Sequence, residues 1–518
     1  MTSFAPRGGW DDVIVGAGSA GAVLAARLSE DPERQVLLIE AGSGGIPPGD
    51  EPDTLGTPVV TGYNWDYSAH VGSRAGRGRR YPYPVGKVLG GSSAVNGAIA
   101  LRGLPADFDG WADAGNPLWA WEHVQPYFVR IEDDPGAGAP GHGVGGPIPI
   151  RRPHHDELSV ITSAFLRACA DNGLLEVPDL NGGPGTGVGL VPSNARGNTR
   201  MSTAATYLAS AVDRPNLTVR TGCRAVALVR NGRRVTGVEV VSNGRLHEVL
   251  AGRVVLSAGA VNTPAILLRS GIGDAERLRR LGIRQTAHLP GVGRNLADHV
   301  AVAMWAVPNP GVCQDGEPWH EAMARVASGA GGHPDLNLFL ANNVSTSAVP
   351  ALGQMVAEEK AVSLSAMLVS PASRGEVFLT EADADPTIVL RLVTNPGDVE
   401  SLMCGARLAW AVVRSSRVAE LLKHLVVWTD RMVEDDSTLR RMVETFAAPT
   451  LHPSGTARMG PETDDLAVVD QCCRVHQVEG LWITDASVMP SIPSAPTNLT
   501  CIMLAERVAE WMAESGKA

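Results

Sequence analysis

Residues 12–40 read DVIVGAGSAGAVLAARLSEDPERQVLLIE, and this stretch decides the fold. Gly16, Gly18 and Gly21 follow the spacing G-x-G-x-x-G between an apolar run and a helical run, and a second apolar run ends in Glu40. The first glycine makes a tight turn, the second admits a pyrophosphate against the backbone, and the third lets helix and strand pack closely. The terminal carboxylate can hold a ribose hydroxyl. The stretch therefore predicts a βαβ unit that binds NAD or FAD.

The composition limits the class of protein. The chain has 518 residues, more than one ordinary core needs, so we expect two large domains or one domain with interleaved insertions. A net charge of −11 argues against a nucleic-acid partner. No apolar run approaches the roughly 18 residues of a membrane span, and the first residues carry no export signal, so we expect a cytoplasmic protein without a membrane contact. Seven cysteines without a C-x-x-C pair predict neither a disulfide framework nor a metal site.

Further pieces of a dinucleotide-binding domain are scattered along the chain. Gly86–Gly103 carries a Gly-Gly-Ser-Ser turn in front of a helical run. Val254–Gly273 has the pattern strand, tight turn and helix, and Gly480–Met512 has the pattern strand, loop and helix. The first domain is therefore expected to be discontinuous.

The region between these pieces has a different pattern. Over Ala301–Glu444 polar and apolar residues alternate, which is typical of an antiparallel sheet with helices on one face. We expect strands at Val362–Leu368, Gly375–Thr380 and Thr387–Leu392, and helices at Gln354–Lys360 and Leu402–Leu422. The predicted fold class is α/β, with a discontinuous Rossmann-like domain and a second α+β domain built on an antiparallel sheet.

Together these pieces resemble the glucose-methanol-choline (GMC) family of FAD-dependent oxidoreductases over nearly the whole chain. Seven ordered motifs carry the resemblance: DVIVGAGSAGAVLAARLSE at the start, GKVLGGSSAVNG at Gly86–Gly97, SAGAVNTPAILLRSGIG at Ser257–Gly273, GVGRNLADH at Gly291–His299, SPASRGEVFL at Ser370–Leu379, HPSGTARMG at His452–Gly460 and LWITDASVMP at Leu481–Pro490. The resemblance implies an FAD-binding domain of residues 1–155, 195–300 and 445–518. Residues 156–194 and 301–444 would form the substrate-binding domain.

The resemblance implies FAD, rather than NAD, as the cofactor. Asp485 would lie by the pyrophosphate or ribityl end and Val226 by the adenine. The segment Gly91–Ala98 would follow the isoalloxazine, with Asn96 and Gly97 near its reactive edge. The expected cofactor-binding residues are Gly16, Gly18, Ser19, Ala20, Gly21, Glu40, Ala41, Val88, Gly91, Ser92, Asn96, Gly97, Ala98, Val226, Asp485, Ala486, Thr497 and Asn498.

The mode of FAD attachment is also implied. Some family members bind FAD covalently through a histidine in the segment after the paired glycines. Val95 stands at that position in this chain, so we expect a non-covalent flavin.

The expected chemistry is oxidation of an alcohol, in which hydride leaves the carbon while a base takes the hydroxyl proton. Histidine suits the role of base because its pKa lies near the working pH. In the family, the histidine of the motif that begins at His452 stands over the flavin ring and takes this proton. Pro453 restrains His452 to an extended backbone.

The chain departs from the family at the partner of this histidine. The family usually has Asn or a second His about 44 residues later, and this place falls on Pro496, which has no N–H and no polar side chain. Either Asn498 takes the partner role, or Asn498 stays beside the flavin and Pro496 shapes the pocket; we favour the second interpretation. The pairing of histidine with proline resembles the pyridoxine 4-oxidase branch of the family, whose substrate is a heteroaromatic primary alcohol.

The expected enzyme is thus an FAD-dependent oxidase or dehydrogenase of a small primary alcohol, aromatic or heteroaromatic, with O2 or another electron acceptor. Alternatives are a choline- or hydroxymethylfurfural-type alcohol dehydrogenase or oxidase, and a flavin-containing hydroxynitrile lyase on the same scaffold. The specific alcohol, the acceptor and the oligomeric state do not follow from the sequence.

Overall fold

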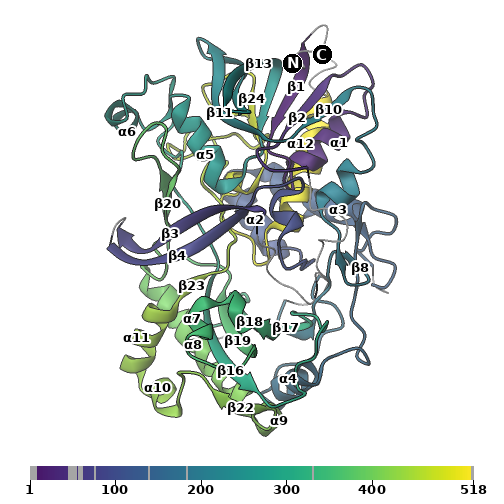
Figure 1. Ribbon diagram of the computed structural model, residues 1–518, viewed down its shortest axis with the longest axis vertical. Coiled ribbons are helices and arrows are strands. Elements are labelled where there is room, and N and C mark those ends of the chain that lie inside the picture. Colours follow the sequence, from purple (N-terminus) through teal and green to yellow (C-terminus); the bar gives the residue numbers. More distant parts are fainter. Residues whose placement is uncertain are drawn as a thin grey trace.

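The computed structural model describes residues 9–44, 55, 62–74, 77–137, 140–182, 185–329 and 332–514. In Figure 1 two bodies lie one above the other. The upper body contains a largely parallel sheet, and the lower body is built on an antiparallel sheet. Both β1 (Trp10–Val15) and the last helix, α12 (Asn498–Glu514), belong to the upper body, so the chain leaves this body and returns to it.

The upper sheet grows from the βαβ unit that the sequence predicted. Its parallel strands are, in spatial order, β10 (Leu217–Arg220), β2 (Val36–Ile39), β1, β13 (Arg245–Leu256) and β24 (Leu481–Ile483). The first half of β13 pairs in antiparallel fashion with β12 (Arg234–Ser242), which pairs with β11 (Cys223–Asn231). Every residue of β2 is buried, as expected for a parallel strand covered on both faces.

Two helices close the amino-terminal unit. The helix α1 (Gly21–Leu28) lies beside α12, and Arg27 of α1 forms an ion pair with the buried Glu506 of α12 at 2.9 Å. A third helix, α5 (Gly259–Arg269), follows β13. The carboxyl ends of β1, β2, β13 and β24 therefore lie at one edge of the sheet, which is the usual place for a dinucleotide.

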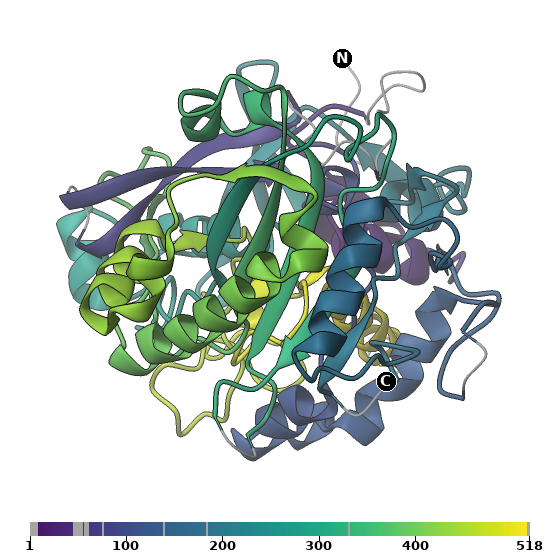
Figure 2. The same cartoon turned by 90° about the horizontal axis from the view of Figure 1, so that it is seen from below.

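The lower sheet is antiparallel. Its strands are, in spatial order, β22 (Leu422–Leu425), β16 (Val300–Pro308), β19 (Lys360–Leu368), β18 (Leu336–Ser345), β17 (Ala322–Val326) and β7 (Gly187–Leu190), and β23 (Ala448–Pro449) also pairs with β16. Seen from below in Figure 2, α8 (Pro396–Arg414) and its neighbours lie across these strands. The other face of the sheet is turned towards the upper body.

A separate small sheet joins the two bodies at one side. A long hairpin, β3 (Asn64–Arg74) and β4 (Arg77–Gly86), pairs with β21 (Thr387–Val389), which pairs with β20 (Glu376–Phe378). The strands predicted at Gly375–Thr380 and Thr387–Leu392 are therefore present, but they belong to this sheet rather than to the antiparallel sheet of the lower body.

The two helices predicted in this region need correction. The prediction over Gln354–Lys360 is wrong: α7 covers only Pro350–Gly353, and Lys360 already begins β19, opposite Ser345. The prediction over Leu402–Leu422 is right in its first part, where α8 lies. The Asn395 side chain accepts from the backbone N–H of Gly397 at 2.8 Å and starts α8 earlier, while Leu422 belongs to β22.

The remaining elements connect and cover these sheets. The other helices are α2 (Pro105–Asp113), α3 (Trp121–Ile131), α4 (Val160–Asp171), α6 (Ala275–Arg280), α9 (Ser416–Ala419), α10 (Asp430–Glu434) and α11 (Asp436–Phe446). Short strands are β5 (Glu132–Asp133), β6 (Ile148–Pro149), β8 (Ala195–Arg196), β9 (Thr199–Arg200), β14 (Ile272–Gly273) and β15 (Ala287–His288). Short helical turns are η1 (Gly91–Ala94), η2 (Pro117–Trp119), η3 (Ala204–Leu208), η4 (Thr346–Ala348) and η5 (Ala486–Val488).

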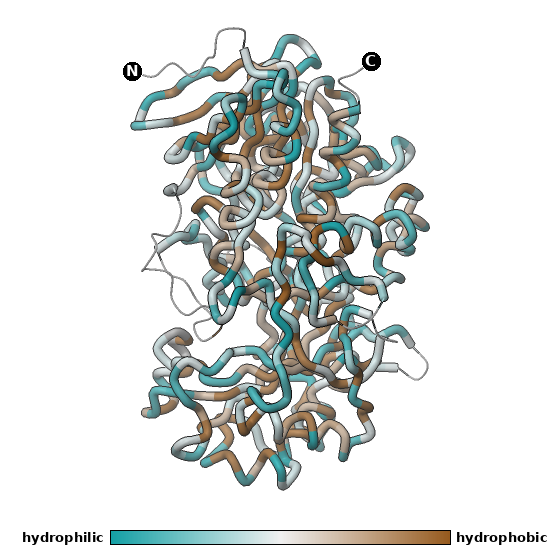
Figure 3. Tube along the Cα trace, turned by 90° about the vertical axis from the view of Figure 1, so that its right-hand side faces the viewer, coloured by the Kyte–Doolittle hydropathy of each residue, from teal (hydrophilic) through white to brown (hydrophobic). Residues whose placement is uncertain are grey.

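The hydropathy of the chain follows this architecture. In Figure 3 many outer loops are teal, and brown stretches run through both bodies. Among the described residues, none of the helices combines the length and the apolar character that a membrane crossing requires.

Candidate active site

A cavity of about 570 Å³ lies between the two bodies and joins most of the predicted site residues. The upper body lines it with the glycine loop after β1, the ends of β2 and β24, the start of α5 and the first residue of α12. The lower body lines it with one face of β16, β18 and β19. The cavity thus connects a dinucleotide site to a second sheet.

The glycine loop is shaped by backbone contacts that a side chain would prevent. Gly16 has φ +98°, and a Cβ there would lie 2.5 Å from the carbonyl oxygen of Ser257. A Cβ on Gly91, which has φ +52°, would lie 2.7 Å from the Cα atom of Gly18. Two backbone segments therefore meet without side chains and leave a cradle beside the amino terminus of α1, where backbone N–H groups favour phosphate.

Glu40 lies at the end of β2, on the wall of this cradle. Its Oε2 accepts from the backbone N–H of Ala17 at 2.9 Å, and its Oε1 accepts from that of Gly42 at 2.8 Å. Burial raises the pKa of Glu40. The two backbone bonds hold the carboxyl group in one orientation, from which its remaining lone pairs can accept a ribose hydroxyl.

Two polar residues near the carboxyl end of the chain also face the cradle. The buried Asp485 accepts from Thr263 Oγ1 at 2.6 Å and from the backbone N–H of Gly259 at 2.9 Å, and burial raises its pKa. Asn498 Oδ1 accepts from Ser19 Oγ at 2.8 Å. Asn498 is thus tied to the glycine loop, on the dinucleotide side of the cavity.

His452 lies at the junction of the two parts of the cavity. Its backbone N–H donates to Asp298 Oδ1 at 2.8 Å, and Asp298 Oδ2 accepts from Tyr83 Oη at 2.5 Å. Burial raises the pKa of Asp298 to about 7. The backbone of His452 is therefore held by a carboxyl group that a second element, β4, supports.

The hydrogen bonds of two histidines decide which ring nitrogens carry protons. His299 Nε2 lies 2.9 Å from the carbonyl oxygen of Pro493, which can only accept, so Nε2 carries the proton. Burial, together with the neighbouring His452, lowers the pKa of His299 well below its usual value. The ring is then neutral, and His299 Nδ1 is an acceptor.

His452 must therefore donate from its Nδ1. His452 Nδ1 lies 3.0 Å from His299 Nδ1 and 3.0 Å from Thr450 Oγ1. Burial lowers the pKa of His452 to about 4, so the ring carries one proton at neutral pH. His452 Nε2 is left with a free lone pair for a ligand in the cavity.

The wall formed by the lower sheet is aromatic and polar. The register places Asn337 opposite Met367, Phe339 opposite Ser365 and Ala341 opposite Ser363, and all six residues line the cavity. Trp305 of β16 and the loop residues Trp319 and His320 complete this wall. Within the described part of the chain, the Asn337 amide and the hydroxyls of Ser363 and Ser365 hydrogen-bond no protein group.

Charge is distributed unequally over the cavity. Its charged lining residues are Glu40, Arg224, Arg269 and Asp485, all from the upper body. Among the described residues that line the cavity, those of the lower sheet carry no charge at neutral pH. The wall formed by the lower sheet therefore presents aromatic rings and neutral hydrogen-bonding groups to a ligand in the cavity.

The predicted residues divide into two groups. Those that line the cavity are His452, Pro496, Asn498, Gly16, Gly18, Ser19, Ala20, Glu40, Ala41, Gly91, Ser92, Asn96, Gly97, Asp485, Ala486 and Thr497. Those that lie outside the lining are Gly21, Val88, Ala98 and Val226. Gly21 packs against Gly16, Val88 and Ala98 are buried behind the cradle, and Val226 follows the lining residue Ala225.

Sequence reasoning assigned no role to several residues that shape this site. Asp298 and His299 stand inside one of the quoted motifs, and adjacent acidic and imidazole groups were a usable signal. His320 stands in a region without a motif. Its place on the wall depends on the pairing of distant strands, which the spacing does not reveal.

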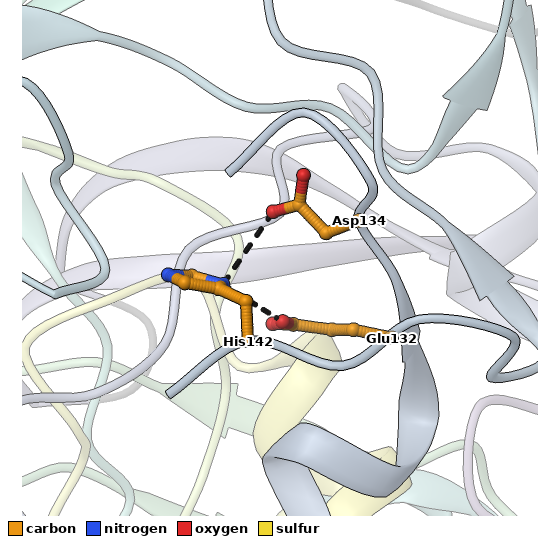
Figure 4. A group of neighbouring side chains, drawn as sticks. All are labelled: Glu132, Asp134 and His142. Atoms are coloured by element: carbon orange, nitrogen blue, oxygen red, sulfur yellow. Dashed lines mark hydrogen bonds and ion pairs between the residues drawn. The ribbon is translucent and has the colours of Figure 1, made fainter. Parts of the chain in front are cut away.

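A cluster outside the cavity has the composition of a metal site. Ligand atoms of Glu132, Asp134 and His142 all lie within 4.8 Å of one another (Figure 4). However, Arg102 pairs with Glu132, and Arg152 pairs with Asp134 at 2.8 Å. Because both carboxylates already form ion pairs with these guanidinium groups, the cluster is an ion-pair network.

Comparison with known proteins agrees with this geometry. A dinucleotide cradle that opens onto a histidine with a free ring nitrogen fits a cofactor-dependent oxidoreductase. Residues 10–301 match the amino-terminal part of the GMC oxidoreductase family, and residues 371–505 match its carboxy-terminal part. The chain belongs to the GMC oxidoreductase family.

Three relatives illustrate the similarity. The chain is 36% identical over 532 residues to 5-(hydroxymethyl)furfural oxidase of Methylovorus sp. strain MP688, covering 97% of this chain and 98% of the relative. It is 35% identical over 523 residues to pyridoxine 4-oxidase of Microbacterium luteolum, covering 96% and 98%. The crystal structure of pyridoxine 4-oxidase from Mesorbium loti superposes with a TM-score of 0.89 at 32% identity, covering 98% of this chain and 99% of that chain.

The protein is therefore an FAD-dependent oxidoreductase that acts on alcohols. The residues of the cavity fit the cofactor. The backbone cradle at Gly18 and Gly91 leaves room that Cβ atoms would fill, and Glu40 is oriented for a ribose.

Proposed function

We propose that this enzyme oxidises a small, neutral primary alcohol that carries an aromatic or heteroaromatic ring, and that it releases the aldehyde. One observation carries the proposal: the same cavity is lined by His452, whose Nε2 has a free lone pair, and by an uncharged wall with aromatic side chains. Trp305, Trp319 and Phe339 offer ring faces and edges to a flat substrate.

When bound, FAD supplies the acceptor for the hydride that leaves the alcohol carbon. His452 Nε2 accepts the hydroxyl proton, and His299 holds the Nδ1 proton of His452 in place. In this proposal Pro496 shapes the pocket, since it can donate no hydrogen bond, and Asn498 stays with Ser19 on the cofactor side.

Two of the relatives support a hydroxymethyl-substituted ring as substrate. Both 5-(hydroxymethyl)furfural and pyridoxine, which the names of two relatives specify, are ring compounds with hydroxymethyl groups. The same names specify oxidases, so we propose O2 as the electron acceptor.

We further propose that the cofactor is held without a covalent bond, because Val95 stands where a linking histidine would be needed. Residues 1–155, 195–300 and 445–518 would form the FAD-binding domain, and residues 156–194 and 301–444 the substrate-binding domain. Acid precipitation should release all of the yellow colour, whereas a flavin-labelled band on a denaturing gel would contradict the non-covalent assignment.

The test of the proposed function is a set of alcohols mixed with the yellow enzyme in air. Pyridoxine, 5-hydroxymethylfurfural and benzyl alcohol should give aldehyde together with consumption of O2, and choline and glucose should react much more slowly. Preference for choline or glucose would overturn the proposed substrate class. If none of the alcohols reacts, release of an aldehyde and cyanide from mandelonitrile would indicate a hydroxynitrile lyase instead.

A further inference from the structure

His320 is the histidine of the cavity that the proposed mechanism leaves without a role. It stands two residues before β17, and it lines the cavity. A Cβ built on Gly97 would lie 3.8 Å from His320 Cδ2. Because Gly97 belongs to the segment expected along the flavin ring, the imidazole of His320 borders the space where an alcohol would bind.

Neighbouring groups hold the His320 ring in one orientation. His320 Nδ1 lies 3.1 Å from the carbonyl oxygen of Leu340. The ring meets Phe339 edge to face, with centroids 4.4 Å apart and an angle of 85°, and Trp319 lies 4.9 Å away. A ring bounded on two sides by aromatic residues and tied by Nδ1 has little freedom to turn.

The bond to Leu340 also decides the tautomer. A carbonyl oxygen only accepts, so Nδ1 carries a proton. Burial lowers the pKa of His320 to about 4, so the neutral ring has no second proton. Nε2 is therefore an acceptor, and within the described part of the chain it has no protein donor.

We propose that His320 is a specificity-determining residue whose Nε2 accepts a hydrogen bond from a second donor on the substrate, a hydroxyl or N–H other than the alcohol that is oxidised. This inference rests on the proposed function, because it concerns the ring alcohol bound beside Gly97. The preferred substrate is then a neutral ring alcohol with two hydrogen-bond donors. Ser363, Ser365 and Asn337 can meet further polar groups of such a ring.

The expected size of the effect follows from the cost of an unpaired group. A substrate without the second donor leaves Nε2 buried and without a partner, and an unmade buried hydrogen bond lowers affinity about ten- to a hundred-fold. A methyl ether removes the donor, keeps the oxygen and adds a methyl group, so the change of the phenol-to-ether ratio on removal of the His320 imidazole reports this bond.

The experiment compares the 2-, 3- and 4-hydroxybenzyl alcohols with their methyl ethers, in wild type, His320→Leu and His320→Gln. For at least one isomer, wild-type kcat/KM should favour the phenol over its ether about ten-fold or more. His320→Leu should lose most of this ratio, chiefly through KM of the phenol. His320→Gln, which supplies an amide oxygen as acceptor, should keep part of it. His155→Gln, which removes an exposed histidine outside the cavity lining, is the control and should keep the ratio.

Other results would overturn the inference. These are equal kcat/KM for every phenol and its ether in the wild type, or a preference that survives in His320→Leu. Binding of phenol and anisole, followed by the change in the flavin spectrum, is a second measurement that needs no turnover. Tighter binding of phenol that is lost in His320→Leu supports the inference even if benzyl alcohols do not react, so failure of the proposed function remains distinguishable. Equal binding contradicts the inference.

Discussion

A histidine can act as a base only if its ring is neutral and if its proton is on the nitrogen that points away from the substrate. His452 meets both conditions. Burial keeps the ring neutral, and the acceptor Nδ1 of His299 takes the hydrogen bond from His452 Nδ1. His299 is itself fixed by the carbonyl of Pro493. A short chain of hydrogen bonds thus prepares Nε2 of His452 to accept a proton.

The pH dependence of catalysis tests this picture of His452. Its pKa is lowered to about 4, so protonation, which removes the base, occurs only in acid. We expect the limb of kcat/KM that reports His452 to fall below about pH 5 with a midpoint near 4. Full recovery of activity on return to pH 7 would exclude unfolding as the cause. The absence of a reversible acid limb with a midpoint near 4 would contradict the lowered pKa of this base.

The residues of the site differ in how far the sequence could predict them. His452, Pro496 and Asn498 were predicted from the resemblance to the GMC family, and all three line the cavity. The contact of His299 with His452 joins residues 153 positions apart, and His320 reaches the cavity through strand pairing. Such contacts depend on packing between distant segments, so no local pattern contains them.

At the scale of elements, helices and strands could be predicted from the sequence where the hydrophobic pattern and the glycine spacing indicated the same structure. The glycine loop, α1 and β2 were predicted because the G-x-G-x-x-G spacing is local to one βαβ unit, in which Gly21 packs against the backbone of Gly16. The helix predicted at Gln354–Lys360 is absent, because the chain turns after α7, where the backbone N–H of Met355 donates to the carbonyl oxygen of Leu352, and Lys360 already pairs with Ser345 of β18. The hairpin of β3 and β4 went unpredicted because its partner strand, β21, lies about 300 residues away.

The ion-pair network at β5 offers a prediction for stability. His142 Nε2 lies 2.8 Å from Asp179, and Nδ1 lies 3.1 Å from Glu132. Hydrogen bonds to Asp179 and Glu132 raise the pKa of His142 to about 9, and its side chain is 3% exposed. A raised pKa means that the protonated ring stabilises the fold fully below the unfolded value of about 6.5, and that this stabilisation is lost as pH rises through 9.

We therefore expect His142→Gln to lower the thermal unfolding midpoint of the FAD-loaded enzyme at pH 6.5, by an amount that corresponds to on the order of 2 kcal/mol. The difference from wild type should shrink towards pH 10, where His142 is neutral in both states. His155→Gln, which removes a 65% exposed histidine paired with Glu176, is the control and should have little effect. A difference for His142→Gln that does not change with pH would refute the charged state of this ring.

At the scale of the molecule, the function arises between two bodies that the chain builds in alternation. The upper body brings the cradle and the charged residues, and the lower body brings an uncharged wall of rings, hydroxyls and an amide. The fold class could be predicted because each body has its own hydrophobic period along the sequence. The cavity could not be predicted from the sequence, because its shape depends on how one face of the lower sheet packs against the carboxyl edge of the upper sheet.

The central claim is that His452 takes the alcohol proton in this cavity, and its most direct test is anaerobic flavin reduction followed near 450 nm. The wild type should bleach with the best ring alcohol. His452→Ala should keep its yellow cofactor but bleach about 10²–10⁴-fold more slowly, and Pro496→Ala should lose far less. Bleaching of His452→Ala at the wild-type rate would contradict the account.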